Sequence, residues 1–236
     1  MKHLILSLAT ALLLVSCTDK SAESNTHIMG TVKGFSSGTV YLQKMNDSVF
    51  VSIDSVKMTG DSKFQFDFDL DSPEMMNIVL DRGVTKSIDN GLPLFVEPGT
   101  ITVTSDLDHF YANAKVTGSK NQELFEQFQK VNTKFKGELL EINKEKFDAI
   151  RFKRLKDVDS IHTKINEKLK RKYLYAINFA ITNKDYEIAP YIALTELSDA
   201  NNKYLDTISK TMTPKVAGSK YGKILNDYIK ERNKSN

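Results

Sequence analysis

The spacing of the hydrophobic residues changes once along the 236-residue chain, near residue 118. Before that point apolar and polar residues alternate, and a period of two is typical of half-buried β-strands. After it, apolar residues recur at intervals of three and four, which is typical of amphipathic helices. The sequence therefore predicts an α+β fold, with an antiparallel β-sandwich-like or barrel-like domain over 27–118 followed by a helical domain over 119–236.

Short turn signals separate the predicted strands. Glycine, proline, serine, aspartate and asparagine cluster at 36–38, 60–62, 71–73, 89–91 and 98–99. Several short strands at this spacing favour an antiparallel sandwich or barrel. The alternation from Lys63 to Leu70 has no error, which places four side chains on one face: Phe64, Phe66, Phe68 and Leu70. Val49, Val51 and Ile53 also alternate, but the parity slips at Asp54-Ser55, and such a slip predicts a β-bulge or a bend.

Capping residues mark the beginnings of helices in the second half. Ser119, with Gln122 three residues later, forms a capping-box pattern that opens a helix. The periodic apolar residues continue to about Thr182 with a predicted break near Asn143, which indicates a helical hairpin or one extended helix. Three further helices are expected, beginning near Pro190, Tyr204 and Ser219.

The N-terminus has the pattern of an export signal. Lys2 precedes an apolar run over 4–15, and a basic start before a short apolar run is typical of secretory signals. The run of about 12 residues is shorter than the roughly 20 that a membrane-spanning helix needs. It ends in Leu14-Val15-Ser16-Cys17, which resembles the bacterial lipobox, and the resemblance implies cleavage after Ser16 and lipidation of Cys17. We therefore expect a lipoprotein signal peptide over 1–16 and a flexible polar tether over 17–26.

Charge and cysteine content limit the function further. A formal net charge of +3 is too small to indicate a nucleic-acid partner. Cys17 is the only cysteine, which excludes an intramolecular disulfide, a CxxC redox pair and a zinc site built from cysteines. We expect a lipid-anchored protein of the cell envelope. Because the acids that follow Cys17 are only Asp19 and Glu23, the favoured location is the outer membrane, facing the periplasm.

Six short strings of residues, taken in order, resemble one known family. They are Ile28–Val32, Gly38–Leu42, Ile53–Val56, Lys63–Phe66, Pro93–Gly99 and Val116–Ser119. The set is similar to the domain of unknown function (DUF4369 type) at the N-terminus of many thioredoxin-like lipoproteins of Bacteroidetes. The stretch from Ser119 to about Arg232 is similar to the helical linker of those proteins. Their redox activity belongs to a following thioredoxin domain with a CxxC pair, and with one cysteine in this sequence the resemblance implies no redox activity here.

Few residues qualify as site candidates. Asp67, Asp69 and Asp71 lie at alternate positions and could bind calcium. The glycine and distal glutamate of a calcium loop are missing, however, and the outward face of a strand explains these aspartates. Glu97, beside Pro98-Gly99, is either a site carboxylate or, more commonly, a surface side chain flanking a turn. The histidines His27, His109 and His162 show no metal-ligand spacing, and no nucleophile motif is present, so no catalytic, cofactor or metal site is predicted.

The predicted helical half contains a basic stretch. Lys144 to Lys172 holds eleven Lys or Arg against five Asp or Glu, most densely at Lys168–Lys172. Such a stretch could contact an anionic membrane surface, lipopolysaccharide or an acidic partner. A solvated helix face, on which Lys and Arg stems cover apolar neighbours, is the favoured interpretation.

These observations favour a non-enzymatic binding or scaffold protein without a cofactor, held on a membrane by lipid and contacting another envelope protein. Long helices suit protein contacts, and a β-sandwich suits peptide or ligand binding at an edge or a face. The alternative is an auxiliary to a thioredoxin-like redox system acting in trans, which rests on the family resemblance alone. An unrecognised hydrolase is a third and less favoured hypothesis.

Overall fold

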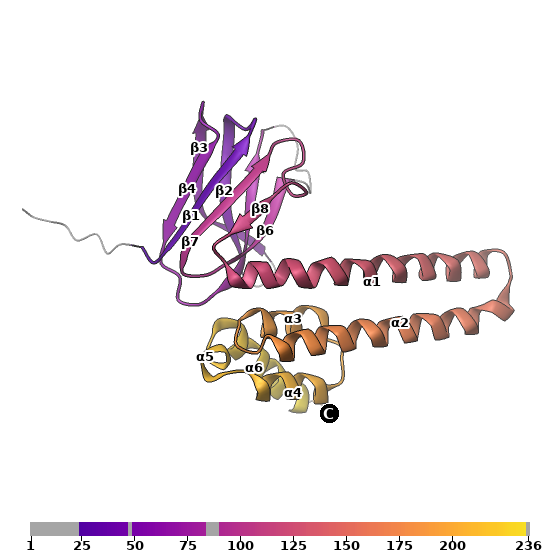
Figure 1. The fold of residues 1–236 in the computed structure, drawn as a ribbon. Coiled ribbons are helices and arrows are strands. Elements are labelled where there is room, and N and C mark those ends of the chain that lie inside the picture. Colours follow the sequence, from indigo (N-terminus) through magenta and orange to yellow (C-terminus); the bar gives the residue numbers. More distant parts are fainter. Residues whose placement is uncertain (1–23, 47–48, 84–89, 235–236) are drawn as a thin grey trace, which may run out of the picture.

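Two four-stranded sheets form the N-terminal half of the molecule (Figure 1). The computed structural model describes residues 24–46, 49–83 and 90–234. One sheet has the order β4-β1-β7-β8 and the other the order β3-β2-β5-β6, so the predicted sandwich followed by helices is confirmed. The strands are β1 (Thr26–Lys33), β2 (Ser37–Asn46), β3 (Val49–Thr59), β4 (Lys63–Phe68), β5 (Glu74–Asp81), β6 (Gly91–Val96), β7 (Gly99–Asp106) and β8 (Lys115–Thr117).

The pairing is antiparallel except at one place. β1 pairs with β7 in parallel, and between these two strands the chain forms β4 and the whole second sheet. The predicted bulge is also present: Leu42 pairs with Asp54 and Gln43 with Ser52, so Ile53 is the extra residue on β3. The bulge lies one residue before the predicted slip at Asp54-Ser55.

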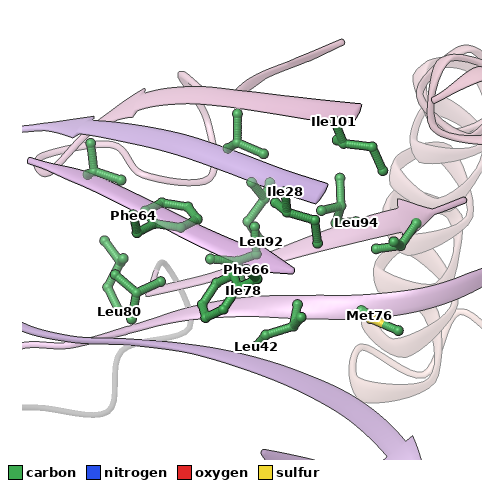
Figure 2. Packing of buried hydrophobic residues seen from close by; sticks show 14 of the residues in the cluster. Ile28, Leu42, Phe64, Phe66, Met76, Ile78, Leu80, Leu92, Leu94 and Ile101 are labelled. Atoms are coloured by element: carbon green, nitrogen blue, oxygen red, sulfur yellow. The ribbon is translucent and has the colours of Figure 1, made fainter. Parts of the chain in front are cut away.

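The sandwich core is made by the inward side chains of both sheets (Figure 2). Phe64 and Phe66 of β4 are buried on the predicted face, with ring centroids 5.5 Å apart. They pack with aliphatic side chains from β1, β2, β5, β6 and β7, including Ile28, Leu42, Ile78, Leu94 and Ile101. The period of two therefore identified the buried face of these strands.

The fold begins slightly earlier than the predicted tether boundary. Asn25 exchanges side-chain hydrogen bonds with the backbone of Leu70: its Nδ2 donates to the carbonyl at 3.1 Å, and the Leu70 N–H donates to its Oδ1 at 2.9 Å. Thr26, assigned to the tether from sequence, is buried and opens β1. These contacts fix the chain to the sandwich from Asn25 onward.

Six helices follow, and the first two form a long hairpin that extends away from the sandwich (Figure 1). The predicted break near Asn143 is wrong, because the Asn143 side chain donates to the carbonyl of Leu139 one turn earlier and the helix continues. The turn falls instead at residues 152–154. The helices are α1 (Lys120–Arg151), α2 (Leu155–Thr182), α3 (Ile188–Glu196), α4 (Asn202–Thr211), α5 (Pro214–Ala217) and α6 (Lys220–Lys234).

A charged contact ties the base of the hairpin to α3. The carboxylate of Glu196 lies 2.8 Å from the ammonium groups of both Lys136 on α1 and Lys172 on α2. Burial opposes ionisation of Glu196, but the two lysines outweigh it and hold the pKa of this carboxyl below its usual value. Lys168 pairs in turn with Glu138, so two of the lysines in the densest basic segment neutralise acids of this molecule.

Among the described residues, no helix is both long enough and apolar enough to cross a membrane.

Helix α1 is fixed to the end of β6 by its first residues. Ser119 is the N-cap: its hydroxyl accepts from the Gln122 N–H at 3.0 Å, as the capping pattern predicted, and donates to the Phe95 carbonyl at 2.8 Å. The Gln122 side chain accepts from the Phe95 N–H at 2.8 Å, so the backbone of Phe95 is held on both sides. Gly118 makes the turn into the helix with φ of +94°, and a Cβ there would meet the carbonyl of Thr100.

The ring of Phe95 is the main sandwich side chain in the helical core. It is fully buried among residues of α1, α2, α3 and α6, and its edge contacts Tyr191 at 5.5 Å and Tyr221 at 6.0 Å between ring centroids. The ring of Phe95 therefore joins the two halves of the molecule by hydrophobic packing, in addition to the hydrogen bonds at the start of α1.

Replacing Phe95 should test this joint. Phe95→Ala removes a fully buried ring and should lower the free energy of unfolding by about 3–5 kcal/mol. Phe147→Ala is the matched control, since Phe147 is exposed on α1, and should change stability by less than about 0.5 kcal/mol. Urea unfolding followed by circular dichroism measures both. Equal stability of the two variants would show that the Phe95 contact does not hold the halves together.

Candidate functional site

Two cavities lie where the sandwich meets the helices, and neighbouring residues line them. One cavity is lined by Lys44, Glu74 and Lys220, among others. The other is lined by the residue that follows each of these in the chain: Met45, Met75 and Tyr221. In β2 and β5 this separation follows from the strand geometry, because consecutive side chains point to opposite faces. The junction thus presents a polar cleft and an apolar groove.

The polar cleft has a volume of about 510 Å³ and a balanced set of charges. Four lysines and four acids line it: Lys44, Lys215, Lys220 and Lys223, with Asp69, Asp71, Glu74 and Glu187. The two buried acids already have partners in the protein. Glu74 pairs with Lys220, and Glu187 accepts from the Asn121 side chain at 3.1 Å and lies 4.0 Å from Lys215. Such internal pairing makes the cleft a joint between the two halves.

The apolar groove has a volume of about 400 Å³ and lies between the outer face of the β3-β2-β5-β6 sheet and helices α3 and α6. Its described lining is methionine, aromatic and proline side chains with two polar ones: Met45, Phe50, Met75, Met76, Asn77, Pro93, Tyr191, Thr195 and Tyr221. The Oδ1 atom of Asn77 is buried and has no hydrogen-bond partner among the described residues. An apolar groove with a few polar groups is typical of a binding site.

The helical wall of the groove is held in place by hydrogen bonding and ring packing. The Tyr221 hydroxyl accepts from the Met75 N–H at 2.9 Å, which ties α6 to β5. Tyr191 and Tyr221 contact each other edge to face at 5.1 Å between centroids, and both contact Phe95. These contacts fix the wall before any ligand arrives, which lowers the entropy lost on binding.

The ionisable groups of the groove are tyrosines. Among the described residues that line it, the only ionisable side chains are Tyr191 and Tyr221. Burial raises the pKa of Tyr191, and it raises the pKa of Tyr221 to about 12 although the Met75 N–H partly opposes this shift. Both tyrosines are therefore protonated at neutral pH. The described lining contains no group that could exchange a proton near pH 7, as general acid–base catalysis requires.

Strand β3 continues the apolar surface beside the groove. It is an edge strand, so one side of its backbone has no neighbour among the described strands. Four apolar side chains at its start are exposed, led by Val49 (65%) and Phe50 (52%), with Val51 and Ile53 beside them. The alternation of these residues had suggested a strand with one buried face, but this end of β3 lies outside the sandwich core. Phe50 belongs both to the edge strand and to the groove.

The fold and these surfaces can be compared with known proteins. Residues 26–125 match the family model of a domain of unknown function, DUF4369. Over these residues the chain is similar to DUF4369 domains. Comparisons with curated proteins and with solved structures gave no match. The matched segment ends inside α1. It therefore includes the sandwich, the capping residues Ser119 and Gln122, and Phe95, to which both are hydrogen-bonded.

The three aspartates singled out in the sequence do not form one site in the matched segment. Asp67 lies 2.6 Å from His27, and this hydrogen bond holds the pKa of its carboxyl below the usual value. Asp69 accepts from the Asn25 N–H at 3.0 Å, and Asp71 lines the polar cleft. Within 24–46, 49–83 and 90–234, no three His, Cys, Asp or Glu side chains lie together in a geometry suited to a metal ion.

Glu97 has a structural role that sequence reasoning missed. The favoured interpretation was a surface side chain beside a turn, but its carboxylate accepts from the N–H of Lys120 at 2.6 Å and from the Asn121 side chain at 2.6 Å. Asn121 is itself buried, and it passes the connection on to Glu187 and to the N–H of Ile188. Glu97 lies 22 residues before the N-cap Ser119 in sequence. No local sequence pattern therefore indicates that its carboxylate stabilises the N-terminus of α1.

The remaining sequence candidates are dispersed. His109 lies in the loop after β7 and His162 on α2, so the histidines of the described chain are not brought together. The groove residues Met45, Met75, Tyr191 and Tyr221 were not predicted, because they come from four separate elements. Cys17, the expected lipidation site, lies outside the described residues.

The pH dependence of stability should report the contact between Tyr221 and Met75. Because the folded-state pKa of Tyr221 is raised to about 12, the unfolded chain loses this proton between pH 10 and 12 while the folded chain keeps it. The free energy of unfolding should therefore fall as the pH rises through this window, by up to about 1.4 kcal/mol per pH unit. Tyr221→Phe should remove this part of the slope. At pH 8 it should also cost about 1–3 kcal/mol, because the Met75 N–H loses its acceptor.

Urea unfolding at a series of pH values from 8 to 11.5 measures both effects. Tyr111→Phe, at an exposed position in the loop after β7, is the matched control and should leave both the slope and the stability at pH 8 unchanged. An alkaline slope that is identical in Tyr221→Phe and in the native protein would contradict the proposed burial of this hydroxyl.

Proposed function

We propose that this protein is a non-enzymatic binding protein of the cell envelope, held on a membrane by lipid on Cys17. The observation that carries the binding function is the apolar groove beside the open edge of β3, whose described lining offers no group for acid–base chemistry. The signal-like residues 1–16 and the lipobox-like ending at Cys17 support the envelope location, on the outer membrane facing the periplasm.

The ligand proposed for the groove is an extended apolar segment of another envelope protein. An edge strand offers a row of backbone N–H and C=O groups, which an incoming extended chain can pair with. Phe50 lies at the point where this edge meets the groove, so a segment paired along Val49–Ile53 would place a side chain against Phe50 at the mouth of the groove. Backbone pairing would give affinity, and the methionine- and tyrosine-lined groove would select an apolar side chain.

The polar groups of the groove support a polypeptide ligand. The buried Oδ1 of Asn77 has no hydrogen-bond partner among the described residues. A buried acceptor left without a partner costs about 1–3 kcal/mol, and a donor from the ligand would satisfy it. The exposed side chains of Phe50 and Met45 lie opposite each other on β3 and β2 and form an apolar surface on one face of this pair, while Val49 is exposed on the other face. Surfaces of this kind on a soluble domain are typical of interaction sites.

The lipid anchor has a direct test. Cys17→Ala should remove the fatty-acid label from the protein and weaken its association with the membrane fraction, because Cys17 is the proposed lipid attachment site. Fractionation of cells grown with an alkyne-labelled fatty acid measures both the location and the label. Equal labelling and equal membrane association of Cys17→Ala and the native protein would show that Cys17 is not the anchor.

The groove can be tested with a photo-crosslinking residue at position 50 of the full-length protein in its own cells. One envelope protein should be crosslinked, and sequencing of the crosslinked peptide should show an apolar segment. Met45→Glu, with the crosslinker kept at position 50, should reduce the yield at least tenfold, because a carboxylate in the groove would be desolvated by the ligand. Ile224→Glu is the matched control, an exposed apolar residue on α6, and should keep the yield.

Three outcomes are decisive. A yield that is unchanged in Met45→Glu would place the partner elsewhere and reject the groove. A crosslinked thioredoxin-like protein would favour the auxiliary redox function. If no protein is crosslinked, the ligand is not a polypeptide, and the proposal fails in its present form.

A further inference from the structure

The distal end of the α1–α2 hairpin exposes an unusual set of side chains. Four large apolar residues lie there with most or half of their surface in solvent: Phe147 (64%), Ile150 (52%), Phe152 (63%) and Leu155 (67%). They fall within nine residues that include the whole turn between the helices. At about 1.5 Å per residue, α1 is roughly 48 Å long, so this end lies far from the sandwich (Figure 1). We call residues 144–156 the tip.

The tip is also the basic part of the hairpin. It holds six basic residues and two acids in sequence, which gives it a formal charge of +4. Arg154 pairs with Asp157, but within the described chain the other five form no ion pair: Lys144, Lys146, Arg151, Lys153 and Lys156. This differs from Lys168–Lys172, where Lys168 and Lys172 pair with acids of α1 and α3. The unneutralised charge of the basic stretch is therefore concentrated beside the exposed apolar side chains.

The turn places Lys153 in a backbone conformation that glycine adopts with less strain. Lys153 has φ of +56°, the left-handed conformation that favours glycine. Its N–H donates to the Ile150 carbonyl at 3.1 Å, and the Arg154 N–H donates to the Ala149 carbonyl at 2.7 Å, which is the hydrogen-bond pattern of a Schellman turn. Glycine at this position would relieve the strain but would remove one cation from the tip.

We propose that the tip binds the surface of a bilayer that contains anionic phospholipid. Exposed Phe, Ile and Leu can enter the boundary between head groups and acyl chains, while neighbouring Lys and Arg contact the phosphates and keep their charges in the head-group layer. Arg151 already stacks on Phe152 with 5.4 Å from its Cζ to the ring centroid, an arrangement that keeps cation and ring together. An acidic protein would be attracted by the same charges, but it would not by itself account for four exposed apolar side chains at the free end of an arm.

The small core under the tip supports a surface role for these side chains. Ala149, Ile161 and Ile165 are buried between α1 and α2, with Leu139, Ile142, Val158 and Leu169 around them. The four apolar residues of the tip are not part of this cluster, so the hairpin packs without them. Replacing them should consequently test binding without unfolding the arm.

The experiment uses the chain from Thr18 onward, which lacks the lipidated cysteine and keeps every helix and strand of the described structure. Co-sedimentation with vesicles of phosphatidylcholine and phosphatidylglycerol at 3:1 should show binding that weakens as salt is added. Vesicles of phosphatidylcholine alone should bind at least tenfold more weakly. Arg151→Gln with Lys153→Gln should weaken binding to the anionic vesicles by about fivefold per residue, on the order of 25-fold together. Lys203→Gln with Lys210→Gln, two exposed lysines of α4, is the charge-matched control and should bind like the native chain.

Insertion has its own readout, because the native chain contains no tryptophan. Phe152→Trp should show a blue shift of its fluorescence when anionic vesicles are added, and Tyr111→Trp, exposed on the sandwich, should show none. Phe147→Ser with Phe152→Ser should weaken vesicle binding at least tenfold while urea unfolding stays unchanged. Lys153→Gly should raise the melting temperature and weaken vesicle binding, so that stability and binding change in opposite directions.

The proposal would be overturned by no binding to anionic vesicles, by equal binding to both vesicle types, or by an equal loss of binding in the control lysine pair. Binding that persists in the double phenylalanine variant but is lost in the Arg151 and Lys153 variant would also overturn it, because the tip would then be attracted by charge alone and would not insert. The test does not depend on the groove or on Cys17, and therefore stands or fails apart from the proposed function.

Discussion

The backbone of Phe95 is the point on which the arrangement of the two halves depends. Its N–H and C=O are held by Gln122 and Ser119 at the start of α1, and its ring is buried among the helices. Because the same residue at the end of β6 both bonds to the start of α1 and packs among the helices, the direction of α1 is fixed relative to the sheet. The groove follows from this placement, since Tyr191 and Tyr221 contact the same ring and face the outer surface of β5 and β6.

The sequence predicted the features that depend on local periodicity and capping. The alternation at Phe64 and Phe66 identified the buried face of β4, and the Ser119 cap located the beginning of α1 within one residue. The bulge on β3 was found one residue from its position, because a parity slip is visible without knowing the partner strand. These are properties of residues a few positions apart, for which chain geometry leaves few alternatives.

Features that join distant residues could not be predicted in this way. The break near Asn143 was misplaced because an amide side chain that usually opposes helix formation is satisfied here within its own helix. The parallel pairing of β1 with β7, the cap of α1 by Glu97 and the lining of the groove all depend on how the sheets and helices are placed together. The composition of the basic stretch was visible, but which of its lysines are neutralised depends on acids of α1 and α3.

The separate hydrophobic clusters have a consequence for the way in which the molecule opens. The outer part of the hairpin packs only around Ala149, Ile161 and Ile165, whereas the sandwich and the helical base each have a much larger cluster. Partial opening of the arm exposes little apolar surface, so the backbone amides of residues 139–165 should exchange with solvent deuterium well before those of β1 or α3. Binding of the hairpin to another surface would slow this exchange. The exchange rate of the hairpin amides would then show whether the hairpin is bound.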